Sequence, residues 1–323
     1  QDALAASVPA KAGTVGKRSR LARGEAVTGW LFVAPWILGF ALFTLGPILF
    51  SLYTSFTRYN MIRAPEWIGT NNYAHILGDR FFWLSLHNTF WMVLVKTPIV
   101  IVLALAIAVL LNLELPWTRA FRTIVYLPSV LSGVAAIFLW RWILAPNGLL
   151  NEGLAVFGIR GPAWFSDPDW TKPGLVIMGL WWIGVDVIIY LASLKGIDKT
   201  LYEAAEIDGA SGWAKNWHIT IPLLSPTTFF LMVTSIIGTF QIFTTAYIIT
   251  SNPAVKTVGG PASSLLFYVL YLYKRAFGQQ VGPGGFQMGY ASALAWILFV
   301  IILLVTLLQL VLAKRWVYYE ADR

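Results

Sequence analysis

The sequence predicts an all-α membrane protein with six transmembrane helices. Of its 323 residues, 58% are hydrophobic and only 12% are charged, whereas soluble domains carry about 25% charged residues. Six apolar segments each approach or exceed the ~20 residues that a helix needs to cross a bilayer. Sixteen Trp and thirteen Tyr residues suit two aromatic belts at the headgroup level. With no Cys in the chain, a disulfide framework, a thiolate metal site and a Cys nucleophile are all excluded.

The predicted spans follow one another along the chain. They cover residues 30–56, 88–112, 123–144, 174–194, 226–250 and 287–314. The first is longer than the apolar core of a cleavable signal peptide, about 7 to 15 residues, and no small-residue cleavage pattern follows closely, so we expect it to be retained. Residues 1–28 are rich in Ala and Gly and contain "KRSRLAR", which predicts a disordered basic tail.

The distribution of Lys and Arg predicts the orientation, because positive charge is retained in cytoplasmic loops. The tail, the 113–122 loop, the 195–225 loop and the C-terminus carry five, two, three and three such residues. The other face carries eight, spread over longer loops. We therefore expect both termini and the 195–225 loop to be cytoplasmic. The net charge of +8 then reflects topology rather than nucleic-acid binding.

A polar segment interrupts the apolar chain between the fourth and fifth spans, and it reads "EAAEIDGASGWAKNWHITIPLLSP" from Glu203. Thr200 followed by Glu203 fits a capping box that begins a short helix. Gly209 supplies the left-handed residue that ends this helix. Ser225 and Pro226 are expected as the N-cap and first-turn proline of the fifth span. A helix of about two turns is marginal in water, so its own bundle or the groove of a partner must hold it.

Two ionisable residues are expected at bilayer depth, where each costs about 2.5 to 3.5 kcal/mol to insert. Asp186 lies midway along the fourth span, and Lys96 lies in the second, nearer its outer end. In one interpretation Asp186 bonds a neighbouring helix and Lys96 reaches the headgroups. In the other, both face a water-filled path.

The fifth span mixes polar and aromatic side chains. Candidates for a substrate path in this span are Thr239, Phe240, Gln241, Thr244 and Tyr247. Hydroxyl and amide groups beside aromatic rings suit the hydroxyls and faces of sugars, but Thr and Gln also hold membrane helices together. The sequence leaves both roles open.

The phrases "EAA", "DGA" and "IPLLSP" occur together in the polar segment. They resemble the cytoplasmic coupling-loop signature of transmembrane subunits in binding-protein-dependent ABC importers. "GWLFVAPWILGFALFTLGPILFSLYTSFTRYN", "FRTIVYLPSVLSGVAAIFLWRWIL" and "MGYASALAWILFVIILL" look like the carbohydrate-uptake branch, the maltose and glycerol-phosphate permease type. The likeness covers about residues 28–315. It implies a type I importer permease with a six-helix domain over 29–315, a coupling loop over 195–225 and a C-terminal tail over 316–323.

The resemblance gives the short helix a role. In such importers this helix sits in a cleft of a separate ATPase and passes its closure to the membrane helices. The motif then implies an acidic ATPase contact at Glu203, small residues for close approach at Ala204 and Ala205, and a turn at Gly209, with Asp208 and Ala210 completing the pattern. The residues alone also allow a simpler interpretation, in which Glu203 only caps the helix and the two alanines only propagate it. Asp198 departs from the pattern, since family members often have Pro there.

The resemblance also implies partners in a bacterial cytoplasmic membrane. These are a second, related permease subunit, two ATP-binding cassette subunits at the coupling loop, and an extracytoplasmic sugar-binding protein. No P-loop occurs in the sequence, so we expect no cofactor on this chain and ATP with Mg on the partner subunits. The expected cargo is a sugar or oligosaccharide. Lys96 and the basic outer loops favour an acidic oligosaccharide, such as a fragment of alginate, as the cargo.

Two other classes of protein remain open. An ion-coupled secondary transporter of a small polar solute would normally show an inverted repeat and a relay of membrane carboxylates, but the chain has one deep Asp and no obvious repeat. A membrane-embedded enzyme would need convergent His, Asp or Ser side chains. His75, His87 and His218 are too far apart in sequence to predict a catalytic or metal centre.

Overall fold

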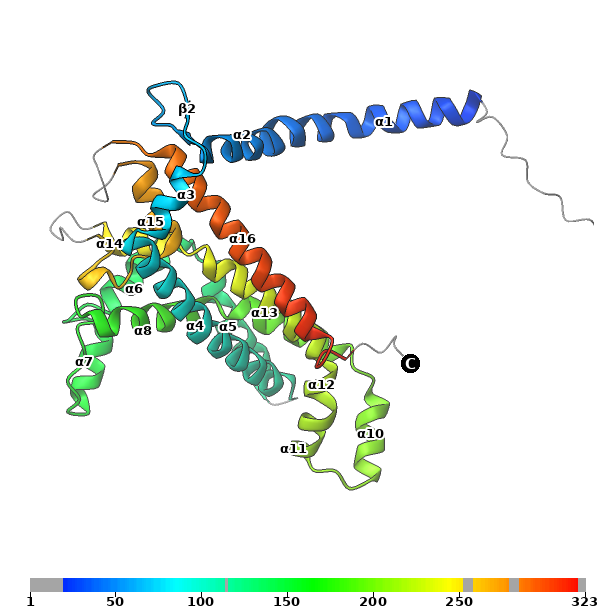
Figure 1. The fold of residues 1–323 in the computed structure, drawn as a ribbon. Coiled ribbons are helices and arrows are strands. Elements are labelled where there is room, and N and C mark those ends of the chain that lie inside the picture. Colours follow the sequence, from blue (N-terminus) through cyan, green and yellow to red (C-terminus); the bar gives the residue numbers. More distant parts are fainter. Residues whose placement is uncertain (1–19, 114–115, 252–257, 279–284, 319–323) are drawn as a thin grey trace, which may run out of the picture. The chain divides into compact units, whose positions relative to one another are not determined.

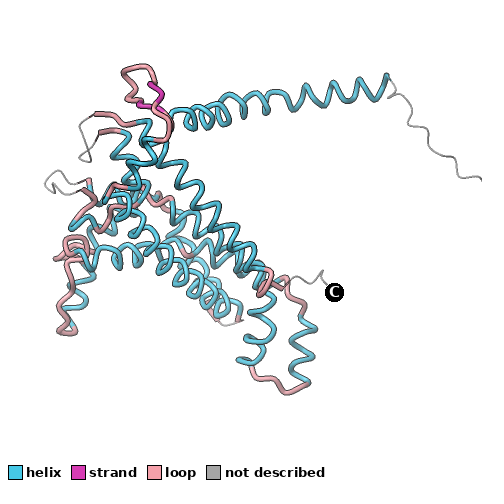
Figure 2. The backbone as a smooth tube through the Cα atoms, viewed as in Figure 1, coloured by secondary structure: helices cyan, strands magenta, loops and turns pink. Residues whose placement is uncertain are grey.

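The computed structural model describes residues 20–113, 116–251, 258–278 and 285–318. The chain divides into two units, Gln1–Tyr53 and Thr54–Arg323. Nearly every element is a helix (Figures 1 and 2), as the sequence predicts.

The first unit is a long apolar helix with one widened turn. α1 (Arg20–Phe40) continues through a π-helical turn (Ala41–Leu45) into α2 (Gly46–Ser55). Glu25–Ser55 is long and apolar enough to cross a membrane, and large side chains along it are exposed, as Phe32 is at 83%. A helix that is apolar all round must be covered by lipid or by another protein.

The second unit is built around one 33-residue helix, α4 (Arg80–Asn112). It packs against α9 (Gly184–Lys195), α13 (Ser225–Phe240) and α15 (Tyr268–Ala276). α16 (Met288–Ala313) packs along α13 and α15. Ala104 and Ala108 of α4 are fully buried, and such small residues let neighbouring membrane helices approach closely.

Two of the predicted spans are bent. α5 (Thr118–Val130) meets α6 (Gly133–Ile143) at 103°, because Leu131 is extended and ends α5 just after Pro128. α8 (Pro168–Gly179) and the 3-10 turn Leu180–Trp182 meet α9 at 48°. In the described residues, four long helices and these two bent pairs match the six predicted spans.

The fifth span is also interrupted. α13 ends at Phe240, residues 241–243 leave the helical path, and α14 (Thr244–Thr250) resumes. Ser225–Thr250 is still long and apolar enough to count as one candidate span. The interruption therefore lies in the middle of the polar and aromatic segment that the sequence singles out.

Short elements connect the spans at the end of the unit opposite α10. They are the antiparallel pair β1 (Thr57–Arg58) and β2 (Glu66–Trp67), α3 (Asn71–Leu77), α7 (Leu149–Val156), the 3-10 turn Pro261–Ser263, and α15. Residues 258–276 lie outside the six predicted spans, yet Leu265, Leu266 and Tyr268 are 0% exposed and belong to the hydrophobic core. The Asn88 amide anchors this segment, because it donates to the carbonyl oxygens of Ser263 and Leu266.

A helical hairpin joins α9 to α13. It consists of α10 (Lys199–Ile207), α11 (Gly212–Lys215), a π-helical turn (Asn216–Thr220) and α12 (Ile221–Leu223). Figure 1 shows α10 and α11 projecting beyond the packed helices, next to the end of α16. The 203–226 segment therefore forms a protrusion, as its polarity predicts.

Candidate functional site

The projecting helix α10 begins at a different cap from the one predicted. Asp198 is the N-cap, and its carboxylate accepts a 2.9 Å hydrogen bond from the Thr200 amide. That bond also holds the pKa of the exposed Asp198 carboxyl below its ordinary value. The predicted capping box from Thr200 to Glu203 is therefore wrong, because Asp198 already satisfies the first free amides. The carboxylate of Glu203 therefore does not cap the helix.

The end of α10 matches the prediction. Gly209 has φ +73°, the left-handed conformation. The Ala210 amide donates to the Ala205 carbonyl at 2.9 Å, and the Gly209 amide donates to the Glu206 carbonyl at 3.0 Å. This pair of bonds is a Schellman motif, which closes a helix C-terminus.

Two contacts hold α10 against the returning helical arm of the hairpin. The Lys215 ammonium lies 2.5 Å from the Glu206 carboxylate. The hydroxyls of Tyr202 and Thr220 lie 2.9 Å apart. At the base of the hairpin, Ser225 is the first residue inside α13, where its hydroxyl donates to the Pro222 carbonyl. Ser225 is therefore not the predicted N-cap, and Leu224 occupies that position.

The six motif residues all lie on α10 or in the turn that ends it. Glu203, Ala204, Asp208 and Gly209 are exposed, and Ala205 and Ala210 are half-buried. Large apolar side chains around them are also uncovered: Ile207 is 88% exposed, Trp213 75% and Trp217 59%. The two Trp rings stack at 6.1 Å. An exposed apolar surface of this kind is typical of a site that contacts another protein or the membrane.

Lys96 and Asp186, on α4 and α9, line one small pocket of about 230 Å³. The third wall comes from Thr234 and Ser235 of α13. Gly179 makes room for the lysine, because a Cβ there would lie 3.0 Å from the Lys96 Cε atom. The structure thus brings together the two ionisable residues that the sequence singles out, and adds two hydroxyls that the sequence analysis missed.

The fifth-span candidates divide into two groups. Thr239 and Phe240 are 1% exposed, and the Phe240 ring packs edge-on against Phe90 at 5.2 Å. Gln241 and Thr244 are exposed on either side of the helix break. The first pair therefore lies in the protein core, and the second pair is accessible.

Tyr247 belongs to an aromatic cluster that the sequence analysis did not find. Its ring lies 5.4 Å from Phe243 and 5.3 Å from Tyr273, and Tyr273 lies 4.8 Å from Phe277. The i, i+4 spacing of aromatic residues on α14 and on α15 was the available signal. The cluster places several ring faces beside the break that carries Gln241.

A buried polar network at the other end of the unit was also missed. Asp79 caps α4 and accepts hydrogen bonds from Tyr271 at 2.5 Å and Tyr290 at 3.0 Å, and it pairs with Arg275. Burial alone raises the pKa of Asp79, but the bonds from Tyr271 and the Phe81 amide and the charge of Arg275 outweigh it, so the pKa lies below its ordinary value. The network joins α4, α15 and α16.

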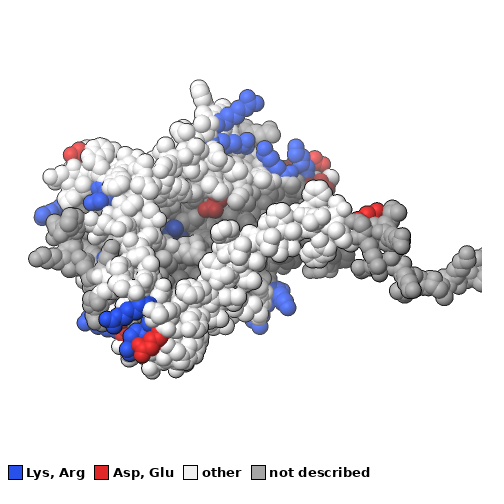
Figure 3. Space-filling view, turned by 90° about the horizontal axis from the view of Figure 1, so that it is seen from above, with Lys and Arg blue, Asp and Glu red and all other residues white. Residues whose placement is uncertain are grey.

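Little of the visible surface is charged. In Figure 3, Lys, Arg, Asp and Glu gather in a few separate groups with uncharged surface between them. In the described residues, no group of three or more His, Cys, Asp or Glu side chains could hold a metal ion.

Comparison with known proteins agrees with this arrangement. Residues 100–318 match the family described as "Binding-protein-dependent transport system inner membrane component". The probable ABC transporter permease protein YesP of Bacillus subtilis is 40% identical, over 94% of this chain and 96% of its own length. The lactose transport system permease protein LacF of Rhizobium radiobacter is 37% identical, over 92% and 98%.

Two solved structures share the fold. A bacterial ABC transporter that imports the acidic polysaccharide alginate gives a TM-score of 0.74 at 24% identity, over 92% of this chain and 99% of that one. A bacterial alginate ABC transporter in complex with an alginate pentasaccharide-bound periplasmic protein gives 0.76 at 23%, over 93% and 98%. These two structural likenesses show a shared fold. The family match and the 40% identity show which family the chain belongs to. The chain belongs to the binding-protein-dependent transport system inner membrane components, as a membrane-embedded ABC transporter permease and not an enzyme.

Proposed function

We propose that this chain is one of two permease subunits of an ATP-driven sugar importer in a bacterial cytoplasmic membrane. One observation carries the proposal: the hairpin projects with Ile207, Trp213 and Trp217 uncovered, and the Glu203 carboxylate forms no hydrogen bond or ion pair with any other described residue. Exposed Trp side chains clustered in this way are typical of the centre of an interface. Two ATPase subunits that hold ATP and Mg are the proposed occupants, one of them on this hairpin.

The hairpin can pass motion to the membrane helices because it connects two walls of one pocket. Asp186 lies on α9, which enters the hairpin, and Thr234 and Ser235 lie on α13, which leaves it. Closure of an ATPase around α10 would shift both walls against Lys96 on α4. The second permease, a related subunit, would supply the facing half of the path.

A saccharide cargo is supported by the relatives and by the side chains at the helix break. Relatives include permeases for lactose and for arabinooligosaccharides, the latter 31% identical over 88% of this chain. Gln241 and Thr244 can hydrogen-bond sugar hydroxyls, and the rings of Phe243, Tyr247 and Tyr273 can pack on sugar faces. Asp186 shares the small pocket with Lys96 and offsets its charge, so the pocket does not by itself select an anion. An extracytoplasmic sugar-binding protein would deliver the cargo.

Uptake by the reconstituted complex tests the proposal. The permease pair, ATPase and binding protein are placed in vesicles, and uptake is measured with lactose, arabinooligosaccharides, malto-oligosaccharides and alginate oligosaccharides. We expect one class to be taken up only with ATP inside and binding protein outside. Uptake driven by an ion gradient without the ATPase would favour the alternative, an ion-coupled secondary transporter.

A further inference from the structure

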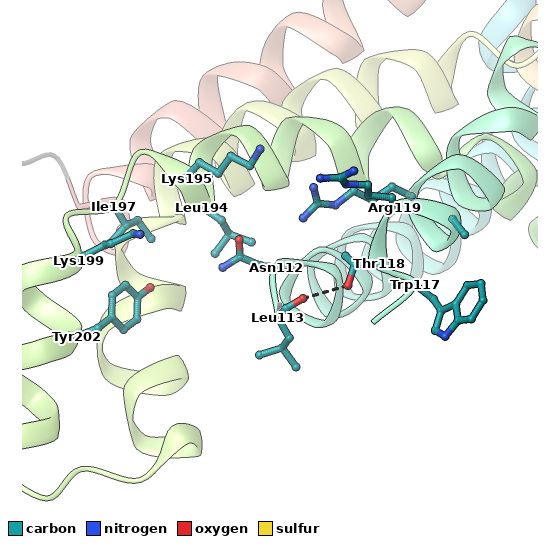
Figure 4. A pocket seen from close by; sticks show the side chains of 12 residues that line it. Asn112, Leu113, Trp117, Thr118, Arg119, Leu194, Lys195, Ile197, Lys199 and Tyr202 are labelled. Atoms are coloured by element: carbon teal, nitrogen blue, oxygen red, sulfur yellow. Dashed lines mark hydrogen bonds between the residues drawn. The ribbon is translucent and has the colours of Figure 1, made fainter. Parts of the chain in front are cut away.

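A second pocket, of about 990 Å³, lies where the hairpin leaves the packed helices. Four cationic side chains line it: Arg119 and Arg122 from α5, Lys195 from the end of α9, and Lys199 from the start of α10. Figure 4 shows Lys195 and Arg119 extending into the space between α9 and α5. The pocket therefore brings charges of one sign together from three helices.

In the part of the chain that the structure describes, no acidic side chain lines this pocket. Asp198 lies next to Lys199 in the chain, but its carboxylate is engaged by the Thr200 amide. Glu114 of the neighbouring loop lies outside the described residues. Even if both carboxylates are counted against the four cations, positive charge remains in excess.

Two features of the described residues favour an anion in this pocket. The Nε atom of Arg122 is buried without a hydrogen-bond partner, although another nitrogen of the same guanidinium donates to the Leu111 carbonyl at 2.8 Å. Lys199 is the first residue of α10, where the helix dipole is positive and disfavours a cation. An anion with several oxygen atoms would accept a hydrogen bond from the Arg122 Nε atom and would balance the positive charge of Lys199 at the start of α10.

The rim of the pocket indicates where that anion comes from. Trp117 is 78% exposed and is held in a left-handed conformation at φ +74°, just before α5. Leu113 beside it is 50% exposed. An exposed Trp next to an exposed Leu and several cations is typical of the membrane surface, where basic pockets bind anionic lipid headgroups.

We propose that this pocket binds the phosphate headgroup of an anionic phospholipid. The bound headgroup draws on the cations that α5, α9 and α10 contribute to the pocket, and so it stabilises the base of the projecting helix. The inference rests on the proposed function only for its consequence, which is that anionic lipid strengthens coupling to the ATPase. Binding itself requires neither ATP nor sugar.

Thermal melting of the full purified complex tests binding without transport. Phosphatidylglycerol, phosphatidylcholine and inorganic phosphate are added separately, in detergent. We expect phosphatidylglycerol to raise Tm by about 3 °C or more, and the other two to leave it unchanged. The variant Arg119→Gln/Lys199→Gln should lose this rise. The matched control is Lys314→Gln/Arg315→Gln, which removes the same charge from exposed positions at the end of α16 and should keep it.

Three results would overturn the proposal. Equal rises in wild type, double variant and control would show a general charge effect. A rise with inorganic phosphate equal to that with phosphatidylglycerol would show a free-phosphate site. No rise in the wild-type complex would show that no lipid occupies the pocket, for instance because an ATPase subunit covers it. If the double variant already melts lower without lipid, the single variants Arg119→Gln and Lys199→Gln are compared, and each should lose part of the rise.

Discussion

The Glu203 carboxylate is available to contact the proposed ATPase subunit. It is exposed, and within the described residues it forms no hydrogen bond or ion pair, because Asp198 caps the helix in its place. A charge reversal at such a position leaves the fold intact but places a lysine in the proposed interface. Leaving charges unpaired in an interface costs about 2 to 5 kcal/mol.

We therefore predict that Glu203→Lys lowers sugar-stimulated ATP hydrolysis by the assembled complex at least tenfold, the factor that ~1.4 kcal/mol represents. Glu152→Lys, in the first turn of α7, makes the same charge change away from α10 and should keep wild-type hydrolysis. Melting temperatures of both variants should match the wild type. Normal stimulation in Glu203→Lys would reduce this residue to a surface position without a coupling role.

Asp79, unlike Glu203, is a charged residue whose partners lie within the fold: it pairs with Arg275 and accepts hydrogen bonds from Tyr271 and Tyr290. Because its pKa is lower in the folded chain than its ordinary value of 3.8, the stability that it contributes is fully present above about pH 4. That stability is lost as the pH falls through the folded-state pKa, where the carboxylate becomes protonated and its charge no longer balances that of Arg275.

We predict that Asp79→Asn lowers the free energy of unfolding at neutral pH by about 3 to 5 kcal/mol, since it removes the carboxylate that balances the charge of the buried Arg275 guanidinium. The melting temperature of the variant should also fall less steeply below pH 4 than that of the wild type, because the variant has no Asp79 carboxylate to protonate. Melting temperature followed from pH 7 to pH 3 measures both effects. Asp169→Asn, at an exposed aspartate, is the control. Identical acid profiles for wild type and Asp79→Asn would contradict the assignment.

At the scale of the elements, the break between α13 and α14 separates two roles that the sequence leaves open. Gln241 is exposed at the break, whereas the Thr239 hydroxyl is buried without a hydrogen-bond partner. A site that hydrogen-bonds its substrate loses discrimination strongly when the polar group is removed. A buried hydroxyl without a partner costs stability, so replacing it by a methyl group is neutral or favourable.

We predict that Gln241→Leu raises the sugar concentration needed for half-maximal transport several-fold and leaves the melting temperature unchanged. Thr239→Val should leave transport affinity unchanged and keep or raise stability, by about 1 kcal/mol. Measuring transport and melting on the same preparations separates the alternatives. A helix-holding role for Gln241 predicts the reverse, a loss of about 1 kcal/mol of stability with normal affinity.

The elements also show what the sequence can and cannot predict. The positions of the six spans were predictable because an apolar run of bilayer length is a local property. The bend after Val130 and the break at residues 241–243 depend on how neighbouring helices pack, so hydropathy does not reveal them. Leu265 and Leu266 are buried by residues far away in the sequence, and Asn88 anchors their segment. Thr200 was predicted as the N-cap, but Asp198 takes that position, and residue type alone did not reveal the error because Asp and Thr both cap well.

For the molecule as a whole, the proposed function makes the two candidate regions parts of one mechanical path. The coupling motif on α10 is linked covalently to α9 and α13, and these helices carry Asp186, Thr234 and Ser235. α9 and α13 run from the two ends of the hairpin to the pocket residues, and Tyr190 of α9 and Leu231 of α13 are buried in one hydrophobic core cluster. A packed core of this kind transmits displacement instead of absorbing it. Coupling therefore requires that the protrusion and the other end of the unit lie on opposite sides of the membrane.

This requirement gives the last prediction. The Lys and Arg distribution places the hairpin in the cytoplasm and α7 outside, and the chain has no Cys to interfere with labelling. Ile207→Cys, at a position that is 88% exposed, should react with an impermeant thiol reagent only from the cytoplasmic face. Val156→Cys, at a position that is 82% exposed, should react only from the outer face. Ala104→Cys, fully buried on α4, should react from neither and controls for leakage. Labelling of the first two from the same face would overturn both the six-span topology and the proposed coupling path.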